Sequence, residues 1–292
     1  MDEDKPIDTN KGMDSLARMV DEQINVLIEI EPILRKSPNK KVSAIHPLFS
    51  TLIEDCISLR LLGNDSRLNQ CYIISRALLE RLINYCYLQI ADEEEFNSFI
   101  DYSHNKAARS LSQSLEVNGE VKASLKYESV DYSLPENLEE AISKFTSARG
   151  REITRWTKAN LAERADLIDK KANKTALFVH ILAIYSDASE AIHGTLYGSI
   201  FHLGAFSPNM RPKDQDSLDK HRFSTLSTLY LLTGSALNTL ISFLYQIGLN
   251  ELKDAKDKSD KLFEASAKAT GLQKIESNKA SQPTPKSGAA EL

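Results

Sequence analysis

Residues 172–204 read ANKTALFVHILAIYSDASEAIHGTLYGSIFHLG, and this stretch is the starting point for the fold. At about 100° per residue, one side of a helix through it is apolar. The residues on that apolar stripe are Leu177, Phe178, Ile181, Tyr185, Ala188 and Ile192. Asp187 and Glu190 point elsewhere, and Gly194 can end the helix. The pattern therefore predicts an amphipathic helix that packs its apolar stripe into a core.

A second row of side chains runs along one shoulder of that stripe. Its members are Leu182, Ser186, Ser189 and His193. An apolar wall there meets a line of hydroxyl groups and an imidazole, which can donate and accept hydrogen bonds or move a proton. We therefore expect chemistry or ligand binding along this row.

The rest of the chain also repeats apolar residues at helical spacing. The helices expected from this periodicity cover residues 14–34, 42–62, 66–90, 92–115, 119–127, 135–147 and 217–248. The fold class is therefore all-α, with a single helical bundle domain over residues 13–252. Residues 1–12 are expected to be a disordered leader, and residues 253–292 a short helical extension followed by a disordered tail.

Composition limits what the chain can be. It has 292 residues, 41% of them hydrophobic, and a formal net charge of −5, which argues against coating nucleic acid by bulk electrostatics. Cys56, Cys71 and Cys86 lie in apolar helical sequence without metal-ligand spacing, so we expect buried reduced thiols and no metal or cofactor. With no secretory signal in the first residues, a cytoplasmic location is expected.

Residues 223–250 contain no charged residue and are long enough to cross a bilayer. About half of them are Ser, Thr, Asn, Gln or Gly, and the apolar ones recur at helical spacing. A buried core helix is the favoured interpretation and a membrane span is the alternative, so no membrane association is expected.

Two further clusters could carry a binding site. Arg76 and Glu80 stand one turn apart on the helix expected over 66–90, and their apolar flanks predict partial burial, so each needs a partner. Residues 148–164 hold Arg151, Arg155 and the only tryptophan, Trp156. This composition suits an anion-binding loop, with a solvated connection around a core tryptophan as the alternative.

Two motifs in this order resemble a known family: Arg76-Ala-Leu-Leu-Glu80, then Tyr185 followed by Ser189-Glu-Ala-Ile-His193-Gly194. Over about residues 45–245 the chain resembles the bacterial domain-of-unknown-function family 5677, placed among the HEPN-like folds. The resemblance implies a helical bundle, a homodimer and, in many HEPN-like proteins, metal-independent RNA cleavage in phage defence, toxin systems or stress responses. Their catalytic signature, Arg followed after four to six residues by His, does not occur in this sequence.

The sequence thus supports two functional hypotheses. In the first, a metal-independent endoribonuclease, His193 acts as acid and base, Arg76 faces the phosphate and Glu80 holds one of them in place. Ser189 and Tyr185 would supply hydrogen bonds to RNA or a nucleotide, and Arg151, Arg155 and Trp156 would bind a flanking part of it. In the second, the chain is a non-catalytic nucleotide- or protein-binding dimerisation module.

Overall fold

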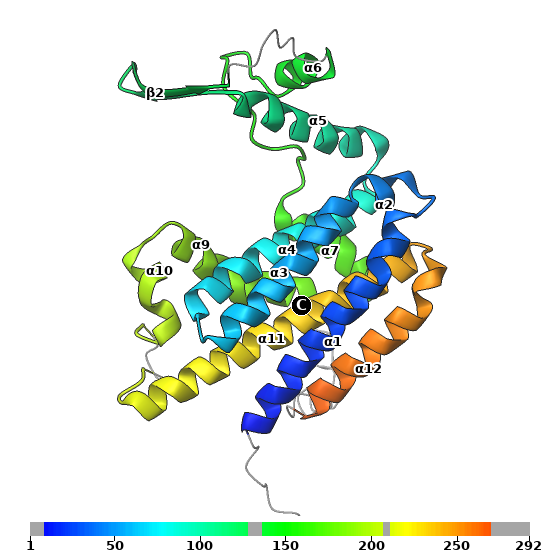
Figure 1. Ribbon diagram of the computed structural model, residues 1–292, viewed down its shortest axis with the longest axis vertical. Helices are drawn as coiled ribbons and strands as arrows, with labels where there is room; N and C mark the ends of the chain where they lie inside the picture. The colour runs from blue at the N-terminus through cyan, green and yellow to red at the C-terminus, as the bar shows by residue number, and fades with distance from the viewer. Residues whose placement is uncertain (1–8, 128–135, 207–210, 270–292) are drawn as a thin grey trace, which may run out of the picture. The chain divides into compact units, whose positions relative to one another are not determined.

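The computed structural model describes residues 9–127, 136–206 and 211–269. These parts are predominantly helical, with one two-stranded sheet, so the all-α class is confirmed (Figure 1). The chain divides into two compact units: unit 1 comprises residues 1–86 and 165–292, and unit 2 comprises residues 87–164. Helices α4 and α7 each cross a boundary between the units.

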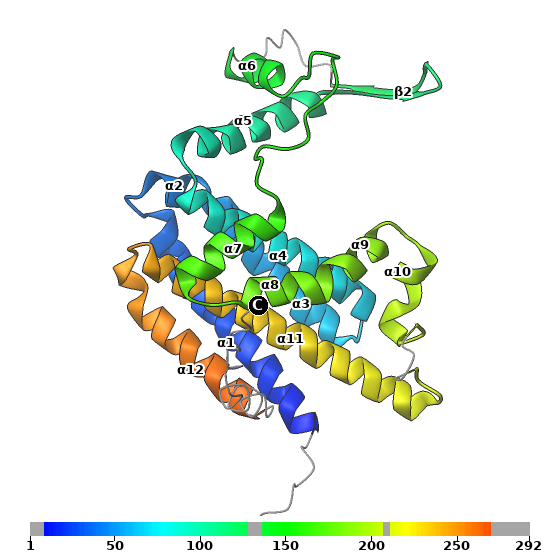
Figure 2. The ribbon, with the colours of Figure 1, turned by 180° about the vertical axis from the view of Figure 1, so that it is seen from behind.

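Unit 1 is built from long helices. They are α1 (Thr9–Arg35), α3 (His46–Asn64), most of α4 (Leu68–Ile90), α11 (Gln215–Gln246) and α12 (Lys253–Ala269). Helices α1, α11 and α12 pack side by side, α3 packs on α1, and α8 (Ala176–His180) packs on α11 (Figure 2). The core lies between these helices, and its largest fully buried side chains include Tyr85, Tyr230 and Phe49.

Short elements connect the long helices of unit 1. They are α2 (Lys40–Ala44), most of α7 (Leu161–Ala172), the π-helical turn η1 (Ile181–Tyr185), α9 (Ser186–Ile192), α10 (Leu196–Ile200), and the 3-10 turns η2 (Phe201–Leu203) and η3 (Asn250–Leu252). Helices α9 and α10 approach closely at Gly198, where a β-carbon would lie 2.1 Å from the Glu190 carbonyl oxygen. Only glycine permits this approach, which fixes α10 against the end of α9.

Helix α11 is the central helix expected from the uncharged stretch of sequence. It is long and apolar enough to cross a membrane, yet 78% of its most hydrophobic 18-residue window is buried within the structure. Burial of this kind is typical of the core helix of a globular domain. Asp214 caps its start, where its carboxylate accepts a hydrogen bond from the Ser217 amide at 2.8 Å.

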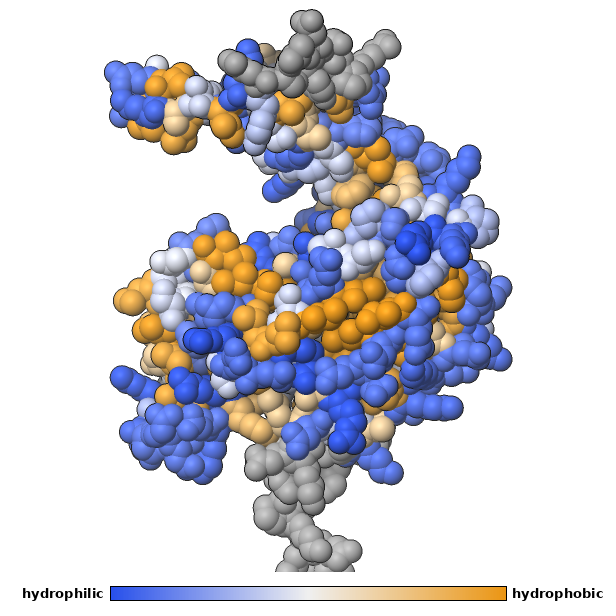
Figure 3. All heavy atoms as spheres, in the orientation of Figure 1, coloured by the Kyte–Doolittle hydropathy of each residue, from blue (hydrophilic) through white to orange (hydrophobic). Residues whose placement is uncertain are grey.

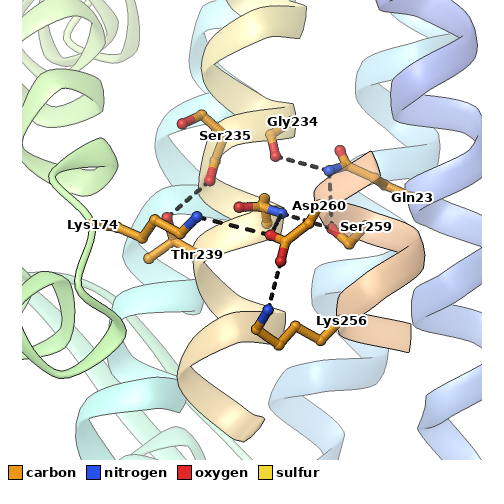
Figure 4. Close-up of polar contacts among 9 residues, drawn as sticks. Gln23, Lys174, Gly234, Ser235, Thr239, Lys256, Ser259 and Asp260 are labelled. Carbon is orange, nitrogen blue, oxygen red and sulfur yellow. Dashed lines mark hydrogen bonds and ion pairs between the residues drawn. The ribbon is translucent and has the colours of Figure 1, made fainter. Parts of the chain in front are cut away.

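Helix α12 is longer and better packed than the expected short extension. Part of its contact with α11 and α1 is polar: Asn238 on α11 donates to Ser259 at 3.3 Å and to Asp260 at 2.8 Å, and Gln23 on α1 donates to Ser259 at 3.4 Å (Figure 4). Within α12, Lys256 pairs with Asp260 at 2.6 Å. Gln23 on α1 donates to the Gly234 carbonyl at 3.0 Å. Apolar periodicity misses such a helix, because hydrogen bonds made by buried Ser and Asn side chains hold part of its contact.

Unit 2 contains α5 (Glu93–Ser110), the hairpin of β1 (Ser112–Val117) and β2 (Glu120–Lys126), and α6 (Glu136–Lys144). The helix expected over 119–127 is therefore wrong, and α5 ends before 115. Asn118 and Gly119 both have positive φ angles, of 55° and 81°, as the two-residue turn of a tight hairpin requires. This turn and the alternation through Leu115 and Val117 were the signals for a hairpin.

The ends of the chain differ from expectation only in part. Helix α1 already includes residues 9–12, which were expected to be disordered. The remainder of the expected leader, residues 1–8, and the expected tail from residue 270 lie outside the described residues. The three cysteines are free and buried, as expected.

Candidate functional site

Helix α4 brings the first two predicted site residues together. The Arg76 Nε donates to a Glu80 carboxylate oxygen at 2.9 Å, one helical turn away. The Arg76 side chain is 18% exposed and that of Glu80 is 39% exposed. The arginine is therefore largely removed from water and needs partners for its other two nitrogens.

Those partners come from residues 172–204, the stretch predicted to form the amphipathic helix. Arg76 Nη1 donates to the Ser189 hydroxyl at 2.5 Å, and Nη2 donates to the Tyr185 hydroxyl at 3.1 Å. The guanidinium also lies over the Tyr185 ring, 4.3 Å from its centroid. Four predicted site residues, Arg76, Glu80, Tyr185 and Ser189, thus form one group, which we call the Arg76 cluster.

The Arg76 cluster joins two i,i+4 pairs, one on α4 and one that spans η1 and α9. Ser189 also donates to the Tyr185 carbonyl at 2.9 Å, so its hydroxyl links the helix backbone to the guanidinium. Burial opposes the charge of Arg76, but the hydrogen bond and charge of Glu80 and the nearby Tyr185 outweigh it, so the pKa of Arg76 is raised. Burial, followed by the charge of Glu80, raises the pKa of Tyr185. Both groups keep their ordinary protonation at neutral pH.

A π-helical turn separates the two halves of the predicted amphipathic helix. In that turn the apolar stripe is shifted: Leu177, His180, Ile184 and Ala188 are buried, whereas Phe178 and Ile192 are 43% and 50% exposed. The buried positions are three, four and four residues apart, but they follow a different line along the helix from the predicted stripe, which included Phe178 and Ile192. The turn places Tyr185 and Ser189 toward α4.

His193 ends α9 as its C-cap, and Gly194 follows with a φ angle of +65°, as the sequence suggested. The His193 side chain is exposed and makes no hydrogen bond or ion pair with any described residue. The structure therefore joins Arg76 to Glu80 but does not join His193 to either of them.

The remaining predicted site residues, Arg151, Arg155 and Trp156, belong to unit 2. Both arginines are exposed, and Trp156 is half-buried. The Trp156 ring packs edge-on against Phe99 at 5.1 Å, with the Arg164 guanidinium 5.4 Å from its centroid.

Two buried polar residues beside the site were missed by the sequence analysis. The Asp169 carboxylate accepts hydrogen bonds from the Leu177 amide at 3.1 Å and the Phe178 amide at 3.2 Å, so it caps the start of α8. His180, directly before the π turn, is fully buried with no partner for either ring nitrogen among the described residues. An acidic residue seven positions before the first residue of a helix gave no recognisable capping signal, and His180 stood one position off the predicted stripe.

No group of three His, Cys, Asp or Glu side chains in the described parts of the chain could hold a metal ion. A pocket of about 320 Å³ lies between η2 and the start of α11, lined by residues that include Leu203, Arg211 and Leu218. None of the predicted site residues lines it.

A family model described as a family of unknown function, DUF5677, matches residues 42–210. The chain belongs to this family. The matched part of this DUF5677 member contains the Arg76 cluster, His193 and all of unit 2, whereas α1, α11 and α12 lie outside it. The chain has no significant match among curated proteins or among solved structures.

The Arg76 cluster makes a measurable prediction about stability. Hydrogen bonds to a charged group contribute about 1.5–3 kcal/mol, so Arg76→Ala and Ser189→Ala should each lower the free energy of unfolding. A double-mutant cycle between them, measured by urea denaturation, should give a coupling of about 1 kcal/mol. Ser186→Ala is the matched control on the exposed side of α9 and should show no coupling with Arg76→Ala. Equal coupling for both serines would contradict the described cluster.

His180 predicts a specific acid sensitivity. Burial lowers its pKa from 6.5 to about 4, so as pH falls through this window the unfolded chain binds a proton that the folded chain does not. Stability should therefore decrease between pH 6.5 and 4, by up to about 3 kcal/mol from this group. In His180→Leu that contribution should disappear from the pH dependence of the unfolding free energy. An unchanged pH dependence in the variant would show that His180 is not buried as described.

Proposed function

We propose that this DUF5677 member is a cytoplasmic, HEPN-like helical dimerisation module, in which the surface formed by residues 178–206 binds a second copy of the chain. The observation that carries the proposal is the exposure of large apolar side chains in this segment. They are Phe178 (43%), Val179 (51%), Leu182 (86%), Ile192 (50%), Leu196 (76%), Tyr197 (39%) and Phe206 (50%). Exposed apolar surface gathered in one segment is typical of an interaction site.

The aromatic part of this surface is already ordered. The rings of Tyr197 and Phe206 stack at 5.1 Å, Tyr197 also stacks on Phe201 at 5.6 Å, and the Tyr197 hydroxyl donates to Asp187 at 2.9 Å. Figure 3 shows hydrophobic residues over the α9 and α10 end of one face of unit 1. Side chains that are fixed before binding lose little entropy when a partner covers them.

The charges of the segment favour a second copy over a basic partner. Its two carboxylates are engaged within the chain, Asp187 by Tyr197 and Glu190 by the Thr195 hydroxyl at 2.8 Å. The attraction that remains is apolar, and apolar contact is the kind that a surface can make with its own copy across a two-fold axis.

Oligomeric state in solution tests the proposal. The wild-type protein should sediment as a dimer, and Ile192→Glu combined with Leu196→Glu should sediment as a folded monomer, because two buried carboxylates per subunit oppose association. Ile28→Glu on α1 is the matched control: Ile28 is 49% exposed, like Ile192, and its variant should remain a dimer. A wild-type protein that stays monomeric at its highest soluble concentration would overturn the proposal.

A metal-independent endoribonuclease is the second candidate function. The observation in its favour is that His193 exposes its imidazole one turn beyond Ser189, whose hydroxyl binds Arg76. In such an enzyme the imidazole would take the 2′-hydroxyl proton of RNA, and Arg76 would stabilise charge on the phosphate. Against it, all three nitrogens of the Arg76 guanidinium already have partners within the chain.

An RNA cleavage assay distinguishes the two functions. With EDTA present, the dimerisation module should leave single-stranded RNA intact, and His193→Ala should behave as the wild type does. Cleavage by the wild type that His193→Ala abolishes would establish the ribonuclease and leave the dimer as its scaffold.

A further inference from the structure

Unit 2 contains a loop whose charges the dimerisation proposal does not use. Residues 148–158 carry four exposed cations: Arg149, Arg151, Arg155 and Lys158. None of these four side chains has an acidic partner or another hydrogen-bond acceptor among the described residues. Four exposed cations without an acidic partner within ten residues form a positive surface, which we call the arginine loop.

The one acidic residue of the arginine loop is held away from this surface. Glu152 pairs with Lys106 at 2.8 Å, accepts a hydrogen bond from Asn105 at 3.1 Å and lies 3.8 Å from Arg109, all on α5. The hydrogen bond from Lys106 is the main cause that lowers the pKa of Glu152. Its charge is therefore neutralised by α5 and does not cancel the loop cations.

The backbone of the arginine loop is anchored to α5. The Ser98 hydroxyl donates to the Trp156 carbonyl at 2.9 Å, and the Tyr102 hydroxyl donates to the Thr154 carbonyl at 3.2 Å. The Ile153 amide donates to the Phe145 carbonyl at 2.9 Å. Between these anchors the chain is held in place, so the cations project from a fixed frame, as a binding loop requires.

The indole of Trp156 belongs to that frame. Its ring contacts Phe99 and Tyr87, with centroids 5.1 Å and 6.1 Å away, and Arg164 lies over it. Because these neighbours already contact the ring, we do not expect Trp156 to stack on a nucleobase. Recognition by the loop would rest on charge and on guanidinium hydrogen bonds.

We propose that the arginine loop binds a single-stranded phosphodiester chain through its phosphates. Arg149 lies in a turn closed by hydrogen bonds from the Gly150 amide to the Ser147 carbonyl and from the Ser147 amide to the Arg151 carbonyl, both at 2.8 Å. Arg151, Arg155 and Lys158 follow at spacings of four and three residues, so the positive charge is spread along the loop. Several cations spread along one loop match the repeated charges of a polyanion better than a single anion. Three of the four are arginines, whose planar guanidinium fits phosphate oxygens in pairs. Binding is independent of base sequence and of the dimer surface.

The test uses the full-length protein and fluorescence anisotropy with labelled oligo-dT and oligo-U, with EDTA present. Affinity should fall with salt, with a slope near −3 in log K against log salt, because about four phosphates are neutralised on a single strand. The double variant Arg151→Glu, Arg155→Glu should bind at least tenfold more weakly and with a shallower slope. The two oligonucleotides separate a DNA from an RNA source, and binding of either one supports the proposal.

The matched control is Lys170→Glu combined with Lys220→Glu, which changes the net charge equally at exposed positions of unit 1. It should bind like the wild type. The proposal is overturned by an arginine-loop variant that binds as tightly as the wild type, or by a control that loses as much affinity. It is also overturned if only vesicles containing phosphatidylserine, or only polyglutamate, bind in a loop-dependent manner. If the loop variant sediments as the same oligomer as the wild type, its loss of oligonucleotide affinity is separate from dimerisation.

Discussion

The guanidinium of Arg76 is the constraint on which the site depends. It is half-buried, always charged, and each of its three nitrogens has one partner: a carboxylate on its own helix and two hydroxyls on η1 and α9. Removal of any partner would leave a half-buried charge incompletely paired, which weakens the link between the helices. The cluster therefore ties α4 to the π turn and fixes the position of the helices that follow, including the exposed apolar side chains of α9 and α10.

The sequence predicted the members of this cluster but not its geometry. The spacing of Arg76 and Glu80, and of Tyr185 and Ser189, placed each pair on one helix face, and their burial followed from apolar neighbours. His193 was placed with them because regular helical periodicity puts it on the same row as Ser189. The π turn at Ile181–Tyr185 precedes both residues and does not separate them, and no local signal in the sequence marks it. His193 is the C-cap at which α9 ends, and its side chain is exposed to solvent.

The fold shows the same division between what periodicity can and cannot predict. Helices with apolar stripes, such as α1, α4 and α11, were predicted within a few residues of their ends. The hairpin at 112–126 was missed, because all of its residues are exposed and it buries no apolar face, although Asn118-Gly119 is a strong turn signal. Helix α12 was underestimated, since part of its contact with α11 is made by hydrogen bonds from Asn238 to Ser259 and Asp260. Polar contacts between distant segments are set by the tertiary fold, which one sequence does not display.

Amide hydrogen exchange in wild-type protein and in Arg76→Gln tests the central claim most directly. If the Arg76 cluster holds η1, α9 and α10 in place, the variant should exchange faster over residues 181–200, while α1 and the buried part of α11 keep their protection. Unchanged exchange over 181–200 in the folded variant would contradict the account, because the position of these helices would then not depend on the buried arginine.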